Sequence, residues 1–352
     1  MYRTLSVYAS FFIISILLIS CKNNGPAEEK LSEEEEQMIL KISQSYFTPL
    51  SEPDLKSLSL DEQKRVELGK KLFYDKRMSG AQTIHCGSCH NMSKYGADNL
   101  AISPGDKDQL GLRNPPTLLN AHLQSILNWD ARYKTVEEQV VAPIFDPALM
   151  AMPDSITLLD RLKGVPYYQQ AFREAFPDDE PAITLRTIGK AIGAFERTLT
   201  SPSRFDDYLK GDLKALNTKE KQGIKSFVEK GCIPCHSTTL LGGNMTQKFA
   251  LFGYYWDYTN STHRDKGRFE YTKNPAEEYV FKVPQLRNIE KTYPYMHDGS
   301  VGSLEDAIRI MSMTESNLQL DEADVEKIAA FLRTLTGKIP KHALEETGKV
   351  FD

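Results

Sequence analysis

The sequence contains the stretch Cys86-Gly87-Ser88-Cys89-His90, and a second stretch of the same form follows at Cys232-Ile233-Pro234-Cys235-His236. Two cysteines three positions apart, followed at once by histidine, are typical of covalent haem attachment. Each thiol can add to one haem vinyl group, while the adjacent imidazole binds the iron. The predicted attachment residues of two haem c groups are Cys86, Cys89, Cys232 and Cys235, and the predicted iron ligands are His90 and His236.

A zinc site and a redox-active disulfide are the alternatives for these cysteines. Two Cys-x-x-Cys knuckles could hold zinc, but the pairs lie far apart in sequence, and zinc would not explain the histidine that follows each pair. A thioredoxin-like disulfide requires a βαβ setting, which the flanking sequence does not show. Haem attachment explains both stretches in full.

The length and charge of the chain limit its class. Its 352 residues suggest two domains with adequate cores. The formal net charge of −5 gives no indication of nucleic-acid binding. Four of the five cysteines belong to the two stretches, so Cys21 alone is left over.

The N-terminus has the pattern of an export signal. Arg3 supplies a basic start, and the apolar run from Phe11 to Ile19 is too short to span a bilayer comfortably. Ser20 directly before Cys21 resembles the lipobox of bacterial lipoproteins, in which this cysteine is lipidated; an ordinary secretory signal is the alternative. We expect an exported protein on the periplasmic face, held to the membrane only through a lipid anchor.

The rest of the chain is rich in helix signals and poor in strand signals. One predicted helix carries Gly69 and Phe73 four positions apart, and another carries Gly223 and Phe227 at the same separation. A capping box, Ser59 to Glu62, opens the first helix and Asn217 to Glu220 opens the second, and each helix leads into one of the haem-attachment stretches. This weak internal repeat predicts two copies of one helical fold.

The expected fold is mainly α, with two cytochrome c-like domains that each hold one covalently attached haem among long irregular loops. Residues 1–21 are expected to be a lipoprotein signal peptide, and the polar, Glu-rich residues 22–45 a flexible tether. The N-terminal domain is expected over 46–210 and the C-terminal domain over 211–340. A tail, 341–352, follows.

Six further stretches give the chain a family resemblance that runs from about Leu68 to Leu335. They are Leu68-Gly69-Lys70-Lys71-Leu72-Phe73, Arg113-Asn114-Pro115-Pro116-Thr117, Trp129-Asp130-Ala131-Arg132, Phe195-Glu196-Arg197-Thr198-Leu199, Val283-Pro284-Gln285-Leu286-Arg287-Asn288 and Pro294-Tyr295-Met296-His297-Asp298-Gly299-Ser300. In combination they are similar to the bacterial di-haem cytochrome c peroxidases and their relatives, which include enzymes that mature tryptophan-derived quinone cofactors.

The resemblance implies that the N-terminal haem meets hydrogen peroxide. The C-terminal haem would accept electrons from a small redox protein such as a cytochrome c. It would be bound by His236 and Met311, with thioether ligation raising its potential. From the helix pattern alone Met311 would be core filler, and Met313 is the fallback ligand.

The resemblance also implies three features of the region between the haems. Trp129 falls where the family places a Trp between them. A calcium ion would be bound by Asn114 through its side chain and by Thr292 and Pro294 through their carbonyls, since oxygen ligands suit this cation. Because relatives are often dimers, a homodimer is also allowed.

The chain departs from the family around the N-terminal haem. Gln139 is retained as a catalytic residue, but Leu149 occupies the position of the family's acid/base Glu. Leu cannot transfer a proton, and a positioned acid/base contributes about a hundred- to ten-thousand-fold in rate. Asp106 falls at the position of the loop His that caps this haem in many relatives, and His122 is expected to be structural. The carboxylates that could substitute for the missing Glu are Asp106, Asp146 and Asp154.

Three functions therefore remain open. The first is an exported di-haem peroxidase. The second is a related di-haem oxidase that acts on a protein or organic substrate. The third is an electron-transfer protein that has lost peroxide chemistry, a reading that the replacement by Leu149 motivates.

Overall fold

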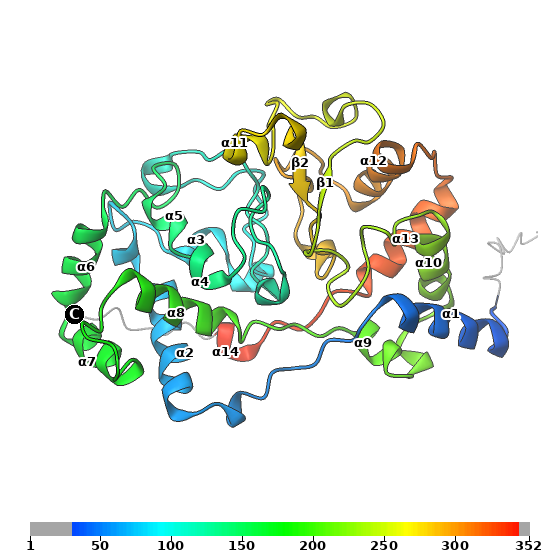
Figure 1. Cartoon of the computed structure of the whole chain (residues 1–352). Helices are drawn as coiled ribbons and strands as arrows, with labels where there is room; N and C mark the ends of the chain where they lie inside the picture. The colour runs from blue at the N-terminus through cyan, green and yellow to red at the C-terminus, as the bar shows by residue number, and fades with distance from the viewer. Residues whose placement is uncertain (1–29, 345–352) are drawn as a thin grey trace, which may run out of the picture.

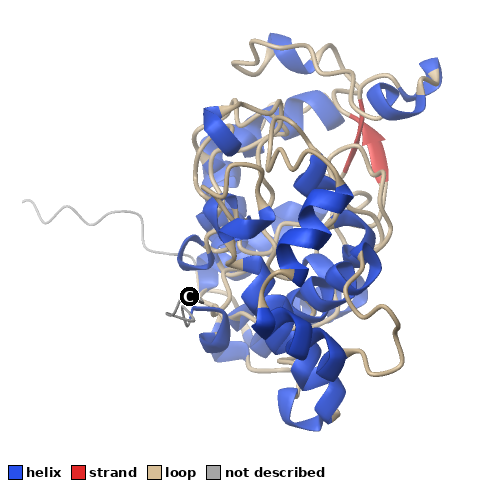
Figure 2. Ribbon diagram, turned by 90° about the vertical axis from the view of Figure 1, so that its left-hand side faces the viewer, coloured by secondary structure: helices blue, strands red, loops and turns tan. Residues whose placement is uncertain are grey.

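The computed structural model describes residues 30–344 and is mainly helical, which confirms the mainly α part of the predicted fold class (Figures 1 and 2). The predicted signal peptide with Cys21, and residues 345–352 of the tail, lie outside the described residues. No helix within residues 30–344 combines the length and the apolar character that a bilayer crossing requires.

The helices are joined by long loops and short 3₁₀ turns. They are α1 (Glu33–Tyr46), α2 (Leu60–Phe73), α3 (Cys86–Cys89), α4 (Val136–Gln139), α5 (Ala142–Phe145), α6 (Ser155–Lys163), α7 (Pro166–Ala175), α8 (Leu185–Glu196), α9 (Arg204–Leu209), α10 (Thr218–Glu229), α11 (Phe269–Thr272), α12 (Leu304–Ser316), α13 (Glu322–Arg333) and α14 (Lys341–Leu344). The strands β1 (Thr246–Lys248) and β2 (Val280–Lys282) pair antiparallel, with Thr246 opposite Lys282.

Two large hydrophobic cores organise the described chain. The first is built mainly from α2, α6, α7 and α8, and Cys86 packs against it. The second is built mainly from α1, α9, α10, α12 and α13, and Cys232 packs against it. The two groups of helices lie on opposite sides of the molecule (Figure 1). Each predicted haem-attachment segment thus has a core of its own.

The flexible tether expected over 22–45 is wrong for residues 33–45, which belong to α1. Ser32 caps this helix through a capping box with Glu35, and the Glu-rich first turn suits the positive end of the helix dipole. Ile39 is 1% exposed and Leu40 is 7% exposed, because both pack into the second core. The run of glutamates suggested a solvated segment, but Ile39 and Leu40 anchor the segment in the second core.

Two helices pack on a different core from the one that their position in the sequence suggests. α9 packs in the second core, although it was expected in the N-terminal domain. In the opposite direction, α14 returns to the first core, where the Tyr74 hydroxyl donates to Ala343 O (3.1 Å). A boundary near residue 210 therefore does not separate the two cores.

The weak repeat of glycine and phenylalanine has a packing cause in both cores. α2 crosses α8, and α10 crosses α13. A Cβ placed on Gly69 would lie 1.8 Å from Ala191 O, and one on Gly223 would lie 2.0 Å from Lys327 O. Glycine thus allows the same close helix crossing beside each haem-attachment segment.

Replacing Gly69 with Ala is expected to lower the free energy of unfolding by about 1–3 kcal/mol, because α2 and α8 must move apart to admit the methyl group. Denaturant unfolding of the purified protein measures this. Gly302→Ala is the matched control, since a Cβ there meets no atom within 4 Å. Equal stability of the two variants would contradict the close-crossing explanation.

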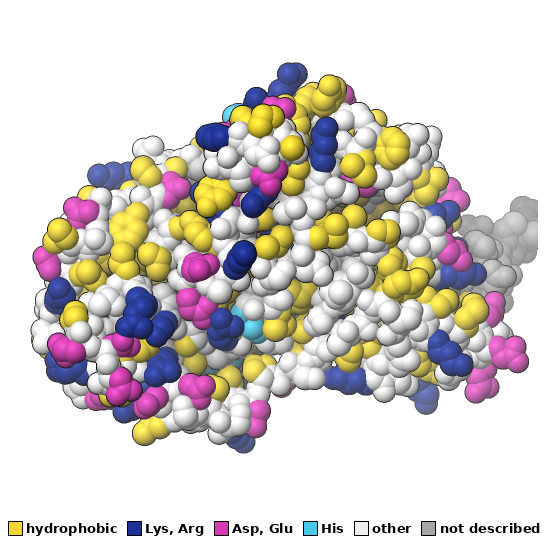
Figure 3. Space-filling view, in the orientation of Figure 1, with side chains coloured by type: hydrophobic (Ala, Val, Ile, Leu, Met, Phe, Trp, Pro, Cys, Tyr) yellow, Lys and Arg dark blue, Asp and Glu magenta, His cyan; other side chains and the backbone are white. Residues whose placement is uncertain are grey.

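Acidic and basic side chains are interspersed on the face shown in Figure 3. Many form exposed ion pairs, such as Lys219–Glu326 at 2.7 Å and Arg309–Glu322 at 2.8 Å. Exposed pairs of this kind contribute about 0–1 kcal/mol each. The fold therefore depends chiefly on its two cores.

Candidate haem sites

The first haem-attachment segment forms the short helix α3 and the turn after it. His90 ends α3, and its ring Nδ1–H donates to Gly96 O (3.2 Å). Burial lowers the pKa of His90 and outweighs the opposing effect of this bond. Histidines that bind metals commonly donate their second ring N–H to a backbone carbonyl. The bond through Nδ1 thus orients the ring and leaves Nε2 as the nitrogen that could bind an iron.

The second segment repeats this arrangement. The ring Nδ1–H of His236 donates to Leu241 O (2.8 Å), and burial lowers the pKa of His236. Burial also raises the pKa of the Cys86 and Cys232 thiols to about 12. Such thiols suit a covalent thioether better than a reactive redox pair. In the described part of the chain, no three His, Cys, Asp or Glu residues converge as zinc ligands would.

A largely apolar cavity of about 250 Å³ lies beside the second segment. Cys232, Cys235 and His236 line it, and Met311 reaches it from α12. Met311 and His236, the pair that the family resemblance implies as iron ligands, thus line one cavity, whereas Met313 is not among the lining residues. These groups fit the attachment and axial ligation of a haem c.

Two residues of this lining also carry buried polar atoms that make no hydrogen bond. Both ring nitrogens of His297 and the Oε1 atom of Gln285 are buried without a hydrogen bond. Buried polar groups are normally satisfied. An occupant with a broad apolar face and polar edges, such as a haem, fits this lining.

Trp129 lies in the wall of the same cavity and is tied to the N-terminal half. Its indole Nε1 donates to Asn114 O (2.8 Å). The backbone N–H of Asn114 donates in turn to His297 O (2.7 Å). A short run of contacts thus connects the two halves through Trp129.

The three predicted calcium ligands are brought to this wall as well. Asn114, Thr292 and Pro294 all line the cavity. The Asn114 side-chain amide donates to Leu100 O (2.8 Å) and Ala101 O (3.1 Å), which leaves its Oδ1 outside these two bonds. One side-chain oxygen and backbone carbonyls are suitable ligands for calcium.

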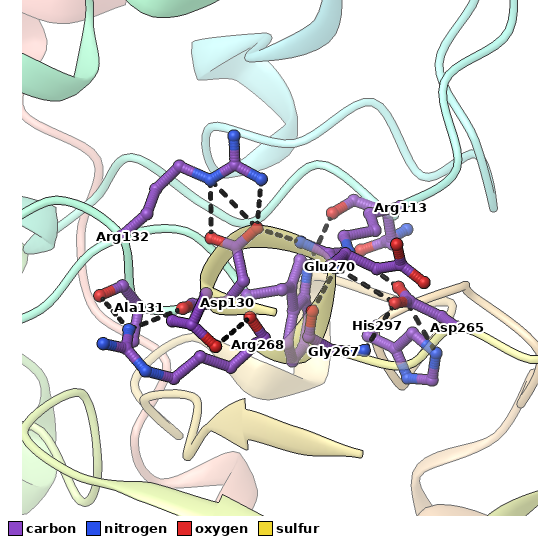
Figure 4. Close-up of polar contacts among 12 residues, drawn as sticks. Arg113, Asp130, Ala131, Arg132, Asp265, Gly267, Arg268, Glu270 and His297 are labelled. Carbon is purple, nitrogen blue, oxygen red and sulfur yellow. Dashed lines mark hydrogen bonds and ion pairs between the residues drawn. The ribbon is translucent and has the colours of Figure 1, made fainter. Parts of the chain in front are cut away.

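A network of charged side chains connects Arg113 and Asp130 with Asp265, which comes from the C-terminal half of the chain (Figure 4). Arg113 binds Asp130 (2.5 Å) and Asp265 (2.7 Å), and Arg132 also binds Asp130. Burial alone would raise the pKa of both Asp130 and Asp265, but the arginine hydrogen bonds and charges outweigh it and lower them. Arg268 adds bonds to the carbonyls of Asp130 (3.0 Å) and Ala131 (2.9 Å).

This network is expected to make the fold acid-sensitive. Because the folded pKa values of Asp130 and Asp265 lie below the ordinary 3.8, their contribution is fully present above that value and is lost as pH falls through the folded pKa values. Denaturant unfolding at a series of pH values from about 6 to 3 should show Asp265→Asn losing less stability than the parent. Parallel curves would contradict the assignment.

Leu149, which the family resemblance places over the first haem, carries no proton, and the nearby Asp106 is engaged in structural hydrogen bonds. Leu149 is half-buried, and its carbonyl accepts from Asp106 N (2.6 Å). The buried Asp106 carboxylate accepts from Ala81 N (2.7 Å) and the Thr83 hydroxyl (2.5 Å). Asp106 therefore serves the loop structure.

The other candidate residues of this side are dispersed. Asp154 caps α6 by accepting from Thr157 N (2.7 Å), and this hydrogen bond lowers its pKa. Asp146 is exposed, and Gln139 is the partly buried last residue of α4. His122 lies 3.5 Å from the Thr200 hydroxyl, and burial lowers its pKa to about 4.

Sequence reasoning missed Lys282 and its partner Gln124, which also line the cavity beside the second attachment segment. The ammonium of Lys282 donates to Gln124 Oε1 (2.5 Å), and both side chains are buried. No local pattern indicates this, because a single lysine in a short strand is normally exposed.

The fold and the two sites define a mainly α protein with two haem-attachment segments joined through Trp129. A family model described as di-haem cytochrome c peroxidase matches residues 63–214. The cytochrome c551 peroxidase of Pseudomonas aeruginosa is 42% identical over 299 residues, covering 84% of this chain and 85% of that protein. The corresponding enzyme of Nitrosomonas europaea is 40% identical over 291 residues, 82% of this chain and 85% of that protein.

More distant similarities agree. The methylamine utilization protein MauG of Methylorubrum extorquens is 32% identical and covers 85% of this chain and 86% of its own. A crystal structure of a MauG-like protein associated with microbial copper homeostasis has a TM-score of 0.72 at 27% identity, covering 86% of this chain and 98% of that one. The chain belongs to the di-haem cytochrome c peroxidase family, whose members are oxidoreductases that act on peroxide.

Proposed function

We propose that the protein reduces hydrogen peroxide to water at a haem held by Cys86, Cys89 and His90. Electrons enter one at a time through a second haem, held by Cys232, Cys235, His236 and Met311. Bound haem iron supplies the redox chemistry at both sites. The observation that carries the proposal is the duplicated arrangement of a half-buried histidine oriented by a backbone carbonyl beside each core.

The residues of the chain support distinct steps. His90 and His236 keep one ring nitrogen free for iron because a carbonyl engages the other. Trp129, fixed by its bond to Asn114 O, lies between the halves where electrons must pass. Gln139 is the remaining family side chain proposed to act on peroxide. Asn114, Thr292 and Pro294 are proposed to hold calcium and stiffen the junction.

We further propose that a small redox protein such as a cytochrome c donates the electrons. The peroxidatic function would belong to residues 46–210 and the electron-transfer function to residues 211–340. α1 packs on the second core and α14 on the first. Export and a lipid on Cys21 would place the enzyme on the periplasmic face of the membrane. A homodimer is compatible with this arrangement.

An electron-transfer protein without peroxide chemistry is the second candidate function. Leu149 in place of a carboxylate favours it, as do the structural partners of Asp106 and Asp154. Stopped-flow mixing of the holoprotein with peroxide and a reduced small cytochrome distinguishes the two. The peroxidase proposal expects a spectral change of the N-terminal haem and donor oxidation well above that of free haem. Absence of both would overturn it.

Replacing Met311 with Leu is expected to remove the sulfur ligand of the C-terminal haem. The oxidised protein should lose its sulfur-to-iron charge-transfer band, and the potential of that haem should fall, because thioether ligation raises it. Met313→Leu is the matched control on the same helix, since Met313 does not line the cavity. Unchanged absorption and potential in Met311→Leu would refute this ligand.

A further inference from the structure

Lys282 is a buried cation at the end of β2. It is 4% exposed, and its ammonium donates to the Oε1 atom of Gln124, which is itself 7% exposed. Within residues 30–344 it forms no ion pair with a carboxylate, and burial alone lowers its pKa to about 8. One neutral acceptor leaves two of its three N–H groups without this partner.

A buried charge of this kind requires compensation. An unpaired ion in the protein interior costs several kcal/mol, and buried charges are normally paired. The backbone N–H of Lys282 is already used, since it donates to Trp129 O (2.7 Å). The side chain is therefore held in place by its strand on one side and by Gln124 on the other. What is missing is an anion.

The position of the ammonium identifies the class of anion. Lys282 and Gln124 line the same cavity as Cys232, His236 and Met311. The other lysines of this lining are engaged or exposed: Lys230 pairs with Asp324 (2.6 Å), and Lys248 lies at the surface. An occupant attached at Cys232 would thus meet one deeply buried positive charge.

We propose that Lys282, positioned by Gln124, is the counter-ion of a propionate of the haem held by His236. The inference rests on the proposed haem site and adds to it a cofactor-binding residue. Propionates are the only carboxylates of haem c, so they match a site that provides one deeply buried ammonium in a largely apolar cavity. Gln124 belongs to the segment before Trp129, and Lys282 belongs to β2. The propionate site would therefore combine residues from two distant parts of the chain.

This assignment has an electrostatic consequence. A fixed positive charge near the haem favours the ferrous state, which carries one positive charge less than the ferric state. Removing the charge is expected to lower the equilibrium constant for reduction of this haem on the order of tenfold. This corresponds to a potential lower by about 59 mV for a one-electron couple. The N-terminal haem should keep its potential, since Lys282 lines the other site.

Spectroelectrochemical titration of the di-haem protein, without peroxide or donor, tests the proposal. Lys282→Met should lower the potential of the C-terminal haem by an amount that corresponds to about a tenfold smaller equilibrium constant for its reduction. Lys282→Arg should restore most of this loss. Gln124→Glu is the second variant, because a carboxylate at that position would compete with the propionate for the ammonium. It too should lower the potential, and it keeps the shape of the side chain.

Lys266→Met is the matched control, since Lys266 is exposed and pairs with Glu278 (2.8 Å) away from the cavity lining. If Lys282→Met and Gln124→Glu both match this control, the proposal is overturned. It is likewise overturned if the N-terminal haem shifts instead. A protein that fails to react with peroxide but shows the predicted shifts would overturn the proposed function and leave this inference standing.

Discussion

Replacing Leu149 with Glu is expected to raise the second-order rate of peroxide reduction by about a hundredfold or more. A positioned acid/base contributes roughly a hundred- to ten-thousand-fold, and two of the three carboxylates that could substitute for it are engaged in structural hydrogen bonds. Asp106 is committed to Ala81 N and the Thr83 hydroxyl, and Asp154 to the cap of α6. Neither can take a proton from peroxide and return it without giving up these bonds.

Leu149 packs beside the loop 104–111, which also approaches the first attachment segment. Leu149 Cδ2 lies 3.5 Å from the place where a Cβ on Gly111 would stand, in the loop that follows Asp106. The same loop approaches the first attachment segment, since Cys89 Sγ lies 4.0 Å from Pro104 O. Glu at residue 149 would therefore enter a half-buried position between this loop and α5.

Steady-state and stopped-flow rates with a reduced cytochrome measure the effect. Leu149→Gln is the matched control, because it adds polarity and similar volume but cannot carry the proton. It should remain at the parent rate. If Leu149→Glu is no faster than Leu149→Gln, a missing acid/base does not limit the reaction, and our placement of residue 149 over the peroxide is wrong.

Local sequence signals predicted much of the fold. The haem-attachment segments, the capped helices and the Gly69 and Gly223 repeat were all identified because each depends on residues within one helix or turn. The shared cavity of Met311 and His236 was also predicted, but only through the family resemblance. Ligation itself stays a proposal.

Contacts between distant segments were not predictable in this way. The Glu-rich composition predicted a solvated tether, whereas the burial of Ile39 and Leu40 depends on α9 and α10. Lys282 and Gln124 are 158 residues apart, so no window of sequence contains both. The hydrogen-bond partners of the buried Asp106 likewise come from a separate loop, some 23–25 residues earlier.

Replacing Asp206 with Asn is expected to cost roughly 3–5 kcal/mol of unfolding free energy, the largest stability effect that we predict. Asp206 on α9 is fully buried and binds Arg287 through two bonds of 2.7 and 2.8 Å. Arg287 is 1% exposed, and its only other bonds are to neutral oxygens in the described structure, such as Thr239 O. Asn would leave this guanidinium buried without a counter-charge.

The effect should extend to the N-terminal segment. Asp206 Oδ1 also accepts from Leu50 N (2.6 Å), so the carboxylate joins residues near α1 to the second core. Denaturant unfolding gives the free energy, and proteolysis after α1 reports release of this segment. Asp207→Asn is the matched control, because Asp207 is exposed on the same helix, and surface changes are usually within about 0.5 kcal/mol.

A double variant separates the charge from the rest of the site. In Asp206→Leu with Arg287→Met, neither charge remains, and replacing a whole buried pair by apolar groups is often close to neutral. Recovery should be incomplete here, because Leu50 N and Ser203 N, which donates to Oδ2 at 2.7 Å, lose their acceptor. The double variant should therefore be more stable than Asp206→Asn but less stable than the parent. Equal stability of Asp206→Asn and Asp207→Asn would show that the buried guanidinium finds compensation elsewhere.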